Sequence, residues 1–224
     1  LSQSVSFDEM LVDLSNAKEG DVVLLHGCCH NPTGANLNHS QWVALAELLC
    51  EKRLVPLIDI AYQGFGDGLE EDTKGLRHLS ENLPEVIIAS SCSKNFGIYR
   101  ERTGIILLIS DKKCQKKINQ DMLAFLNRNS FSFPPDHGSR LVTIVLQDNT
   151  LRKNWEEELR KIRNNKGYYL LCQFNNSKIN YCFNKSLHSH SSVNDNYQFI
   201  AIYSIMFGMP DMRYQYWYRF EKLQ

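Results

Sequence analysis

The sequence predicts an α/β fold in which a mostly parallel sheet is covered by helices. Three apolar runs of strand length, at residues 22–26, 54–60 and 86–89, alternate with segments whose apolar residues have helical spacing. This alternation is typical of parallel sheets, because parallel strands need a crossover connection. Polar side chains follow each of these runs directly, and parallel sheets bind ligands beyond the carboxyl ends of their strands.

The remaining elements follow from capping residues, breakers and periodicity. Ser40 is expected to cap the helix before the second strand, because its hydroxyl can accept a backbone N–H at a helix start. Pro134 and Pro135 are expected to break the helix that begins at Asp111. We expect helices at residues 7–17, 40–49, 76–83, 111–126, 137–146 and 151–163, and a fourth strand at residues 104–110. After residue 164 the sequence shows no clear period, and no element is assigned there.

The composition is that of an ordinary globular protein and disfavours several partner classes. The 224 residues are 43% apolar and 22% charged, and 25 basic side chains balance 25 acidic ones. Without a basic field, we expect no nucleic-acid and no membrane partner. The longest apolar run, near residues 199–209, is too short to span a bilayer. Seven cysteines without a CxxC pair favour reduced thiols and a cytoplasmic location.

One lysine stands alone in a small, hydroxyl-rich loop between two apolar runs. Lys94 has Ser91 three residues before it and Arg102 eight residues after it. A serine and an arginine suit a phosphate, and an amine beside them suits a phosphate-bearing aldehyde. A solvated Ser/Lys turn is the alternative interpretation of a lone SxxK pattern. Two further motifs upstream favour the phosphate-bearing aldehyde.

The second motif, DIAYQGF, places Asp59 at the end of a buried strand. A carboxylate in this position needs a partner, and the protonated nitrogen of a pyridoxal ring can supply one. Tyr62, three residues later, can donate a hydrogen bond to the phenolic oxygen of the same ring. The alternative is a strand-end aspartate that caps a turn.

The third motif, HGCCHNPTG, begins at His26. Asn31 can donate to the same phenolic oxygen, and the proline and glycine that follow favour a turn. His26 and His30 suggest a metal pair, but no cysteine or carboxylate completes a ligand set at fixed spacing, so we expect no metal. Because Asn31, Asp59 and Lys94 each follow a strand, we expect all three at one rim of the sheet.

In this order, HNPTG, DxAYQGF and SxSKNFGxYxERxG resemble the aspartate/aromatic aminotransferases of PLP fold type I, over roughly residues 5–163. The resemblance implies the large domain of that fold and a pyridoxal 5'-phosphate cofactor. It implies transfer of an amino group between aspartate, or an aromatic amino acid, and 2-oxoglutarate. It implies that Lys94 forms the aldimine and moves the proton, that Asp59 pairs with the pyridinium, and that Tyr62 acts beside them. Cofactor contacts are also implied for Asn31, Ser91, Ser93, Arg102 and His30, the last behind Asp59.

A weaker match, RNSFSFPP, begins at Arg128 and resembles the family's RxxYSNPP. In the family this arginine reaches across a dimer interface to the substrate's distal carboxylate, which implies a homodimer with shared active sites. Arg128 takes that role by resemblance, and Asn31 is the second expected substrate contact. Phe131 and Phe133 depart from the family's Tyr and Asn. The alternative is an arginine that the helix dipole favours at a helix C-terminus.

Both ends of the sequence depart from the family pattern. The family's Gly-rich phosphate loop, its ring-stacking aromatic and its GRxxxAG-type segment are not found, so we expect an N-terminally truncated chain with an unmatched tail. We expect residues 1–150 to form a partial cofactor-binding large domain, and residues 151–224 a connecting helix and a small-domain remnant. A catalytically inactive chain that only binds or dimerises is the alternative function. A nucleotide-binding domain, suggested by the glycines at residues 64–68, ranks last because the GxGxxG spacing is absent.

Overall fold

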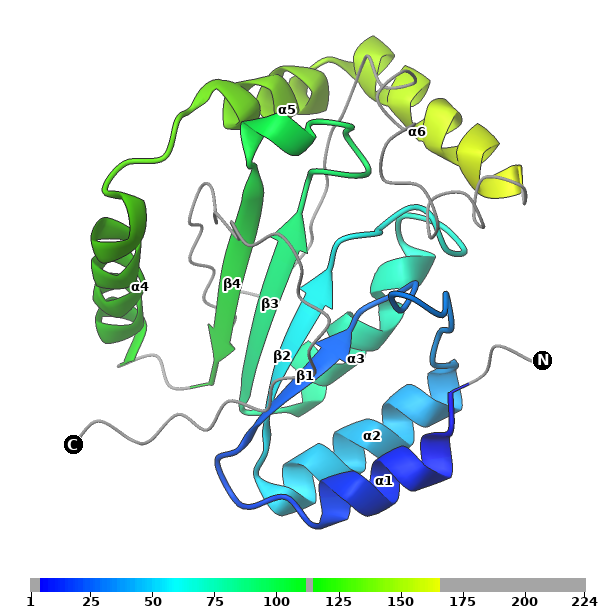
Figure 1. Ribbon diagram of the computed structural model, residues 1–224, viewed down its shortest axis with the longest axis vertical. Coiled ribbons are helices and arrows are strands. Elements are labelled where there is room, and N and C mark those ends of the chain that lie inside the picture. The colour runs from blue at the N-terminus through cyan, green and yellow to red at the C-terminus, as the bar shows by residue number, and fades with distance from the viewer. Residues whose placement is uncertain (1–4, 112–114, 166–224) are drawn as a thin grey trace.

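The computed structural model describes residues 5–111 and 115–165. Along the chain its elements are α1 (Phe7–Ser15), β1 (Val22–His26), α2 (His39–Lys52), β2 (Val55–Ile60), α3 (Lys74–Asn82), β3 (Glu85–Ser91), β4 (Gly104–Ser110), α4 (Lys116–Phe131), α5 (His137–Gln147) and α6 (Asn149–Asn164). Figure 1 shows the sheet at the centre, with α1, α2 and α3 on one side of it and α6 beyond the ends of β2 and β3.

The described strands form one sheet in the order β1-β2-β3-β4. Both β1–β2 and β2–β3 pair in parallel, so the prediction of a mostly parallel α/β sheet is confirmed. The last strand, β4, runs antiparallel to β3. The connection at residues 92–103 contains one short 3-10 turn, Tyr99–Glu101, and no crossover helix, so the chain returns as a hairpin.

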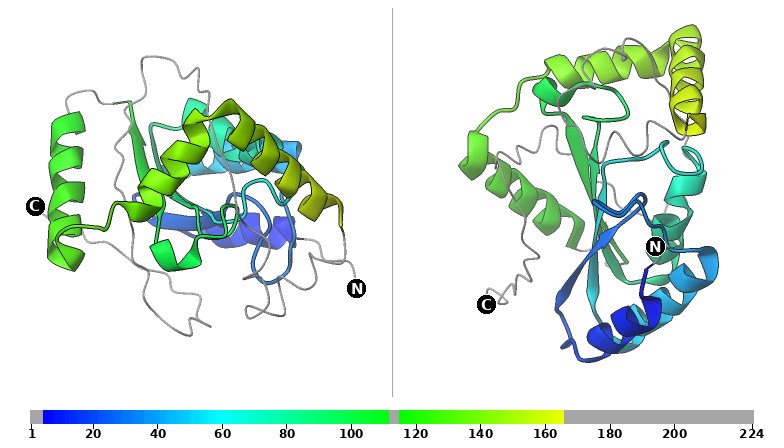
Figure 2. Two further views of the ribbon diagram at one scale, coloured as in Figure 1. Left: turned by 90° about the horizontal axis from the view of Figure 1, so that it is seen from above. Right: turned by 45° about the vertical axis from the view of Figure 1, so that its right-hand side comes forward.

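The two faces of the sheet are packed differently. Successive side chains of a strand point to opposite faces, and Val23, Ile58 and Val86 belong to the face that α2 and α3 cover. These residues are fully or almost fully buried, and we call this face the helix-covered face. The opposite side, here called the second face, carries Leu24, whose side chain is 58% exposed. Figure 2 shows α4 on the side of the second face.

The start of α2 differs from the expectation. The N-cap is Asn38, not Ser40, because Asn38 and Gln41 form a capping box. The Asn38 side chain accepts a hydrogen bond from the Gln41 backbone N–H at 2.9 Å, and the Gln41 side chain accepts one from the Asn38 N–H at 2.9 Å. Ser40 lies inside the first turn, where its hydroxyl donates to the Asn38 side chain.

The helices after β4 also shift from their expected bounds. Helix α4 begins at Lys116 rather than Asp111 and continues past Leu126 to Phe131, so the expected bounds were wrong. It ends two residues before the prolines, after which α5 follows close to its expected position. The last described helix, α6, begins at Asn149 because the Asp148 side chain accepts hydrogen bonds from the next two free backbone N–H groups.

None of the helices in the described part of the chain has the length and apolar character that a membrane span requires. The apolar run at residues 199–209 lies outside the described residues, as does the region of residues 151–224 that follows residue 165.

Candidate active site

The carboxyl ends of β1, β2 and β3 meet at one rim, as the sequence predicts. His26 on β1 is in register with Asp59 on β2, and Asp59 is in register with Ala89 on β3. Residues in register point to the same face of a sheet, so these side chains share the second face. The Gly27 backbone N–H donates to the Asp59 carbonyl oxygen at 2.8 Å, which continues the pairing to the end of the rim.

Asp59 is a half-buried carboxylate in an electrostatically mixed environment. Burial raises its pKa above the ordinary value, while His26 and Lys94 both act to lower the pKa. Among the described residues, no side chain donates a hydrogen bond to this carboxylate. The site therefore has a carboxylate whose charged form is only partly compensated, which suits a cationic N–H donor.

His26 is the histidine that interacts electrostatically with Asp59. Burial and the neighbouring His30 lower the pKa of His26, and Asp59 opposes this effect. The two imidazole rings lie edge to face with centroids 4.7 Å apart. His30 itself pairs through Nδ1 with the Thr33 hydroxyl at 2.8 Å, and burial lowers its pKa. Sequence analysis placed His30 behind Asp59, and the structure puts His26 next to Asp59 with His30 against it.

Lys94 lies in the hairpin between β3 and β4. The Cys92 N–H donates to the Thr103 carbonyl at 3.0 Å and closes the base of this hairpin. The Gly97 N–H donates to the Lys94 carbonyl at 3.1 Å, and Gly97 has a φ of 64°, a conformation that glycine adopts without strain. The Lys94 ammonium lies 4.0 Å from the centroid of the Tyr62 ring. The structure thus brings Lys94, Tyr62 and Asp59 together.

The residues expected at a phosphate lie at the base of the same hairpin. The Ser91 hydroxyl accepts a hydrogen bond from the Ser93 N–H at 3.2 Å, and Ser93 is buried. Arg102 has a left-handed φ of 51°, and its Nη1 donates to the Tyr99 carbonyl at 3.1 Å. Burial raises the pKa of the intervening Cys92 thiol to about 12, so this thiol is neutral at physiological pH.

The glycine-rich loop after β2 is organised by a residue that sequence analysis did not single out. The buried Asp72 carboxylate accepts backbone N–H groups from Gly64 at 2.8 Å, Gly66 at 3.0 Å, Asp67 at 2.7 Å and Gly68 at 3.4 Å. Backbone amides of this kind are what a phosphate-binding loop offers to its ligand. Because Asp72 occupies them, the structure disfavours the nucleotide-binding interpretation of this loop.

Two other site predictions have a different outcome. Asn31 lies in an exposed turn directly after β1, and its peptide bond to Pro32 is cis. Arg128 is exposed near the end of α4. Figures 1 and 2 show α4 beside the β4 edge, set apart from the ends of β1 and β2. Within the described part of one chain, Arg128 and Lys94 are therefore not brought together.

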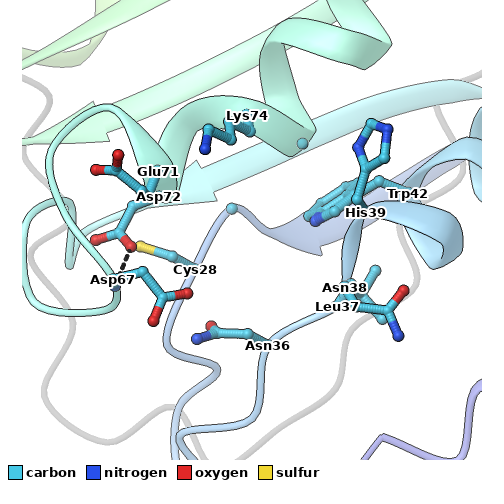
Figure 3. A pocket seen from close by; sticks show the side chains of 12 residues that line it. Cys28, Asn36, Leu37, Asn38, His39, Trp42, Asp67, Glu71, Asp72 and Lys74 are labelled. Carbon is cyan, nitrogen blue, oxygen red and sulfur yellow. Dashed lines mark hydrogen bonds between the residues drawn. The ribbon is translucent and has the colours of Figure 1, made fainter.

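A cavity of about 200 Å³ lies on the other side of the rim, between the start of α2 and the start of α3 (Figure 3). Its lining includes Cys28, His39, Trp42 and the Asp72 carboxylate, and none of the predicted site residues. Burial raises the pKa of the Cys28 thiol, so the thiol stays protonated. The cavity is thus separate from the group around Lys94.

Two contacts from α6 also reach the site loops. Trp155 and Arg163 donate hydrogen bonds to backbone carbonyls beside Lys94 and Tyr62. Sequence analysis treated this helix as a partly exposed connector. The available signal was the spacing of Trp155, Leu159 and Arg163, which places them on one helical face.

Comparison with known proteins identifies the relatives of this chain. The family model "Aminotransferase class I and II" matches residues 2–182. The aromatic-amino-acid aminotransferase of Paracoccus denitrificans is 54% identical over 162 residues, which are 72% of this chain and 41% of that relative. The aspartate aminotransferase of Escherichia coli (strain K12) is 45% identical over 163 residues, with the same two shares.

A solved structure supports the fold. The aromatic-amino-acid aminotransferase from Burkholderia pseudomallei, covalently bound to pyridoxal phosphate, is 42% identical and has a TM-score of 0.70, over 72% of this chain and 41% of that one. This chain therefore spans about two fifths of the length of the relatives that it matches.

Proposed function

This chain belongs to the class I and II aminotransferase family, and on that premise we propose that it carries the cofactor-binding centre of a pyridoxal phosphate-dependent transaminase. The proposed reaction moves an amino group between aspartate, or an aromatic amino acid, and 2-oxoglutarate. The observation that carries the proposal is the approach of the Lys94 ammonium to the Tyr62 ring, 4.0 Å from its centroid, at the rim that Asp59 shares.

The donor set fits the cofactor. When bound, pyridoxal phosphate supplies an aldehyde that bonds amines and a ring that withdraws electrons. Asp59 would hold the ring N–H, because its half-buried carboxylate gains a cationic donor that the described residues do not provide. The Tyr62 hydroxyl and the Asn31 amide would hold the phenolic oxygen. His26, in register with Asp59, and His30 against it would support the carboxylate from behind.

Lys94 is proposed as the catalytic residue. Its amine would bond the cofactor's aldehyde, and after release it would take and return the proton at the substrate's α carbon. Tyr62 keeps this amine near the rim through the contact between the ammonium and the ring face. Asp59 adds electrostatic attraction from the same side of the sheet.

The base of the hairpin is proposed to bind the phosphate. Ser91 and Ser93 offer hydroxyl donors, and Arg102 offers a guanidinium with five N–H donors, of which the Tyr99 carbonyl uses one. The left-handed backbone at Arg102 lies two residues before the start of β4, so both sides of the hairpin contribute to one anion site. Residues 1–150 would then form the cofactor-binding unit, with α6 as the connecting helix after it.

Covalent labelling of Lys94 tests this proposal. The chain is incubated with pyridoxal phosphate, reduced with borohydride, and digested for peptide mass spectrometry. We expect the reduced cofactor on the peptide that contains Lys94, and its loss from that peptide in Lys94→Arg. Lys74, exposed at the start of α3, serves as the internal comparison. Equal labelling of Lys74 and Lys94 would overturn the assignment and favour the inactive alternative.

Arg128 is proposed to bind the substrate's distal carboxylate in the site of a second copy of the chain. The basis is its exposed position on α4, away from Lys94 of the same chain. Arg128→Ala in the active protein is expected to lower kcat/KM for aspartate by a few kcal/mol, since a charge-assisted bond is lost and a charge is left unpaired. Phenylalanine, which has no distal carboxylate, should lose much less.

Mixed dimers provide the control for this arginine. A dimer of one Arg128→Ala subunit and one Lys94→Ala subunit should regain one intact site in two, because each site takes its lysine and its arginine from different copies. Equal losses for aspartate and phenylalanine, without complementation in mixed dimers, would show that Arg128 has a structural role at the end of α4.

A further inference from the structure

Helix α6 presents one continuous face to the two loops of the candidate site. Trp155, Leu159 and Arg163 are spaced four residues apart, so they lie one above the other on the same side of the helix. Trp155 is 4% exposed and Leu159 is 1% exposed. Figure 1 shows this helix beyond the ends of β2 and β3, where both loops begin.

The upper contact is to the Lys94 hairpin. The Trp155 indole N–H donates to the carbonyl of Asn95 at 2.6 Å, and this bond is buried. The indole ring also stacks on Phe96, with ring centroids 5.1 Å apart and an interplanar angle of 23°. Asn95 and Phe96 are the two residues that follow Lys94, so Trp155 fixes the backbone from which the lysine side chain extends.

The lower contact is to the loop that carries Tyr62. The Arg163 guanidinium donates to the Gly64 carbonyl at 2.9 Å. Leu159 packs against the same glycine, where an added Cβ would lie 3.0 Å from the Leu159 methyl. Gly64 has a φ of 93°, which other residues adopt only with strain. This position therefore depends both on glycine and on its contact with α6.

From these contacts we infer that α6 is a brace that positions Lys94 against Tyr62, with Trp155 and Arg163 as positioning residues. Its meaning for catalysis rests on the proposed function. The two anchor points are eight residues apart, or about 12 Å along a helix, and a single rigid element therefore sets the separation of the two loops. Lysine has a long, flexible side chain, so a fixed backbone at its base confines the amine to the rim near Tyr62.

Trp155→Phe tests the brace, because phenylalanine retains a ring over Phe96 and removes only the indole donor. Hydrogen exchange of the cofactor-free chain is followed by mass spectrometry. We expect peptides within residues 92–103 to exchange about tenfold faster, which is the loss of one buried hydrogen bond. Pyridoxal phosphate at a limiting concentration, fixed with borohydride, should label Lys94 about tenfold less.

The matched control is Trp42→Phe, which shortens another buried indole on α2, packed against Gly75 and away from both loops. This variant should lower the unfolding midpoint in urea without faster exchange in residues 92–103. A second variant, Arg163→Met, retains the apolar stem of the arginine and should speed exchange in residues 61–68.

The two arms of the experiment separate the brace from the proposed function. Exchange within residues 92–103 that is unchanged in Trp155→Phe, or changed equally in Trp42→Phe, would overturn the brace. Faster exchange confined to that hairpin, together with weaker Lys94 labelling, would support it. Failure of the unsubstituted chain to accept pyridoxal phosphate at Lys94 would overturn the proposed function, while the exchange arm still decides whether α6 holds the loops.

Discussion

The helix-covered face and the second face of the sheet carry different parts of this protein's physics. On β2, Ile58 and Ile60 point into the core under α2 and α3 and are 0% and 2% exposed. Asp59 lies between them and points to the opposite side, in register with His26. One residue along a strand thus separates a packed aliphatic side chain from a titratable group.

This difference shows why the site can exist where it does. A carboxylate on the helix-covered face would be surrounded by aliphatic side chains, and burial without a donor costs several kcal/mol or forces protonation. On the second face, Asp59 is half-buried and has His26 and Lys94 as electrostatic neighbours. Packing of the helix-covered face stabilises the fold, and the second face is left to provide the chemistry.

The largest expected effect comes from a pair of adjacent leucines on β1. Leu25 is 6% exposed on the helix-covered face, and Leu24 is 58% exposed on the second face. We expect Leu25→Ala to lower the free energy of unfolding by about 2–4 kcal/mol, because a cavity remains in the core. Leu24→Ala should cost less than about 1 kcal/mol. Urea unfolding measures both, and equal losses would show that the two faces are packed alike.

The second prediction concerns Asp59, where stability and function should change in opposite directions. Burial raises its pKa, so the folded chain loses stability relative to the unfolded chain as the pH rises above the ordinary value of 3.8. Asp59→Asn removes this cost and should be the more stable form at neutral pH. Labelling of Lys94 by pyridoxal phosphate should fall about tenfold or more, because a charge-assisted bond is lost.

The control for Asp59 is Asp67→Asn, an exposed carboxylate on the following loop. Urea unfolding at pH 7 and borohydride labelling should both be close to those of the unsubstituted chain. If Asp59→Asn is less stable than the unsubstituted chain at pH 7, the carboxylate has a compensating partner and the contrast between the two faces is weaker than proposed.

The smallest expected effect is the pH dependence that His26 contributes. Burial and His30 lower its pKa below the ordinary value of 6.5, so the unfolded chain binds the proton more tightly. Stability is therefore fully present above pH 6.5 and is lost as the pH falls through the lowered pKa. His26→Gln should reduce this acid-induced loss by a fraction of the Leu25 effect. The exposed His39→Gln on α2 is the control, and an identical pH profile in His26→Gln would contradict the prediction.

Much of the fold was predictable because its signals are local. The apolar runs of β1, β2 and β4 begin and end within one residue of their expected positions, since burial of both faces or alternate positions is written in contiguous residues. Lys94, Asp59 and Tyr62 were predicted from motifs that follow strands, and the topology brings them to one rim. The Asn38 cap was missed because the capping box depends on Gln41 as well as on the first polar residue.

The sequence by itself determined the α/β order, the family and the residues that end each strand, because each depends on neighbours within a few positions. Only the tertiary structure decided which histidine lies next to Asp59, that β4 returns antiparallel, and that Asp72 fills the glycine-rich loop. It also decided that α6 holds both site loops, through bonds that join residues 60 and 99 positions apart. Contacts over such separations leave no local period in a sequence, since they exist only after the intervening chain has folded.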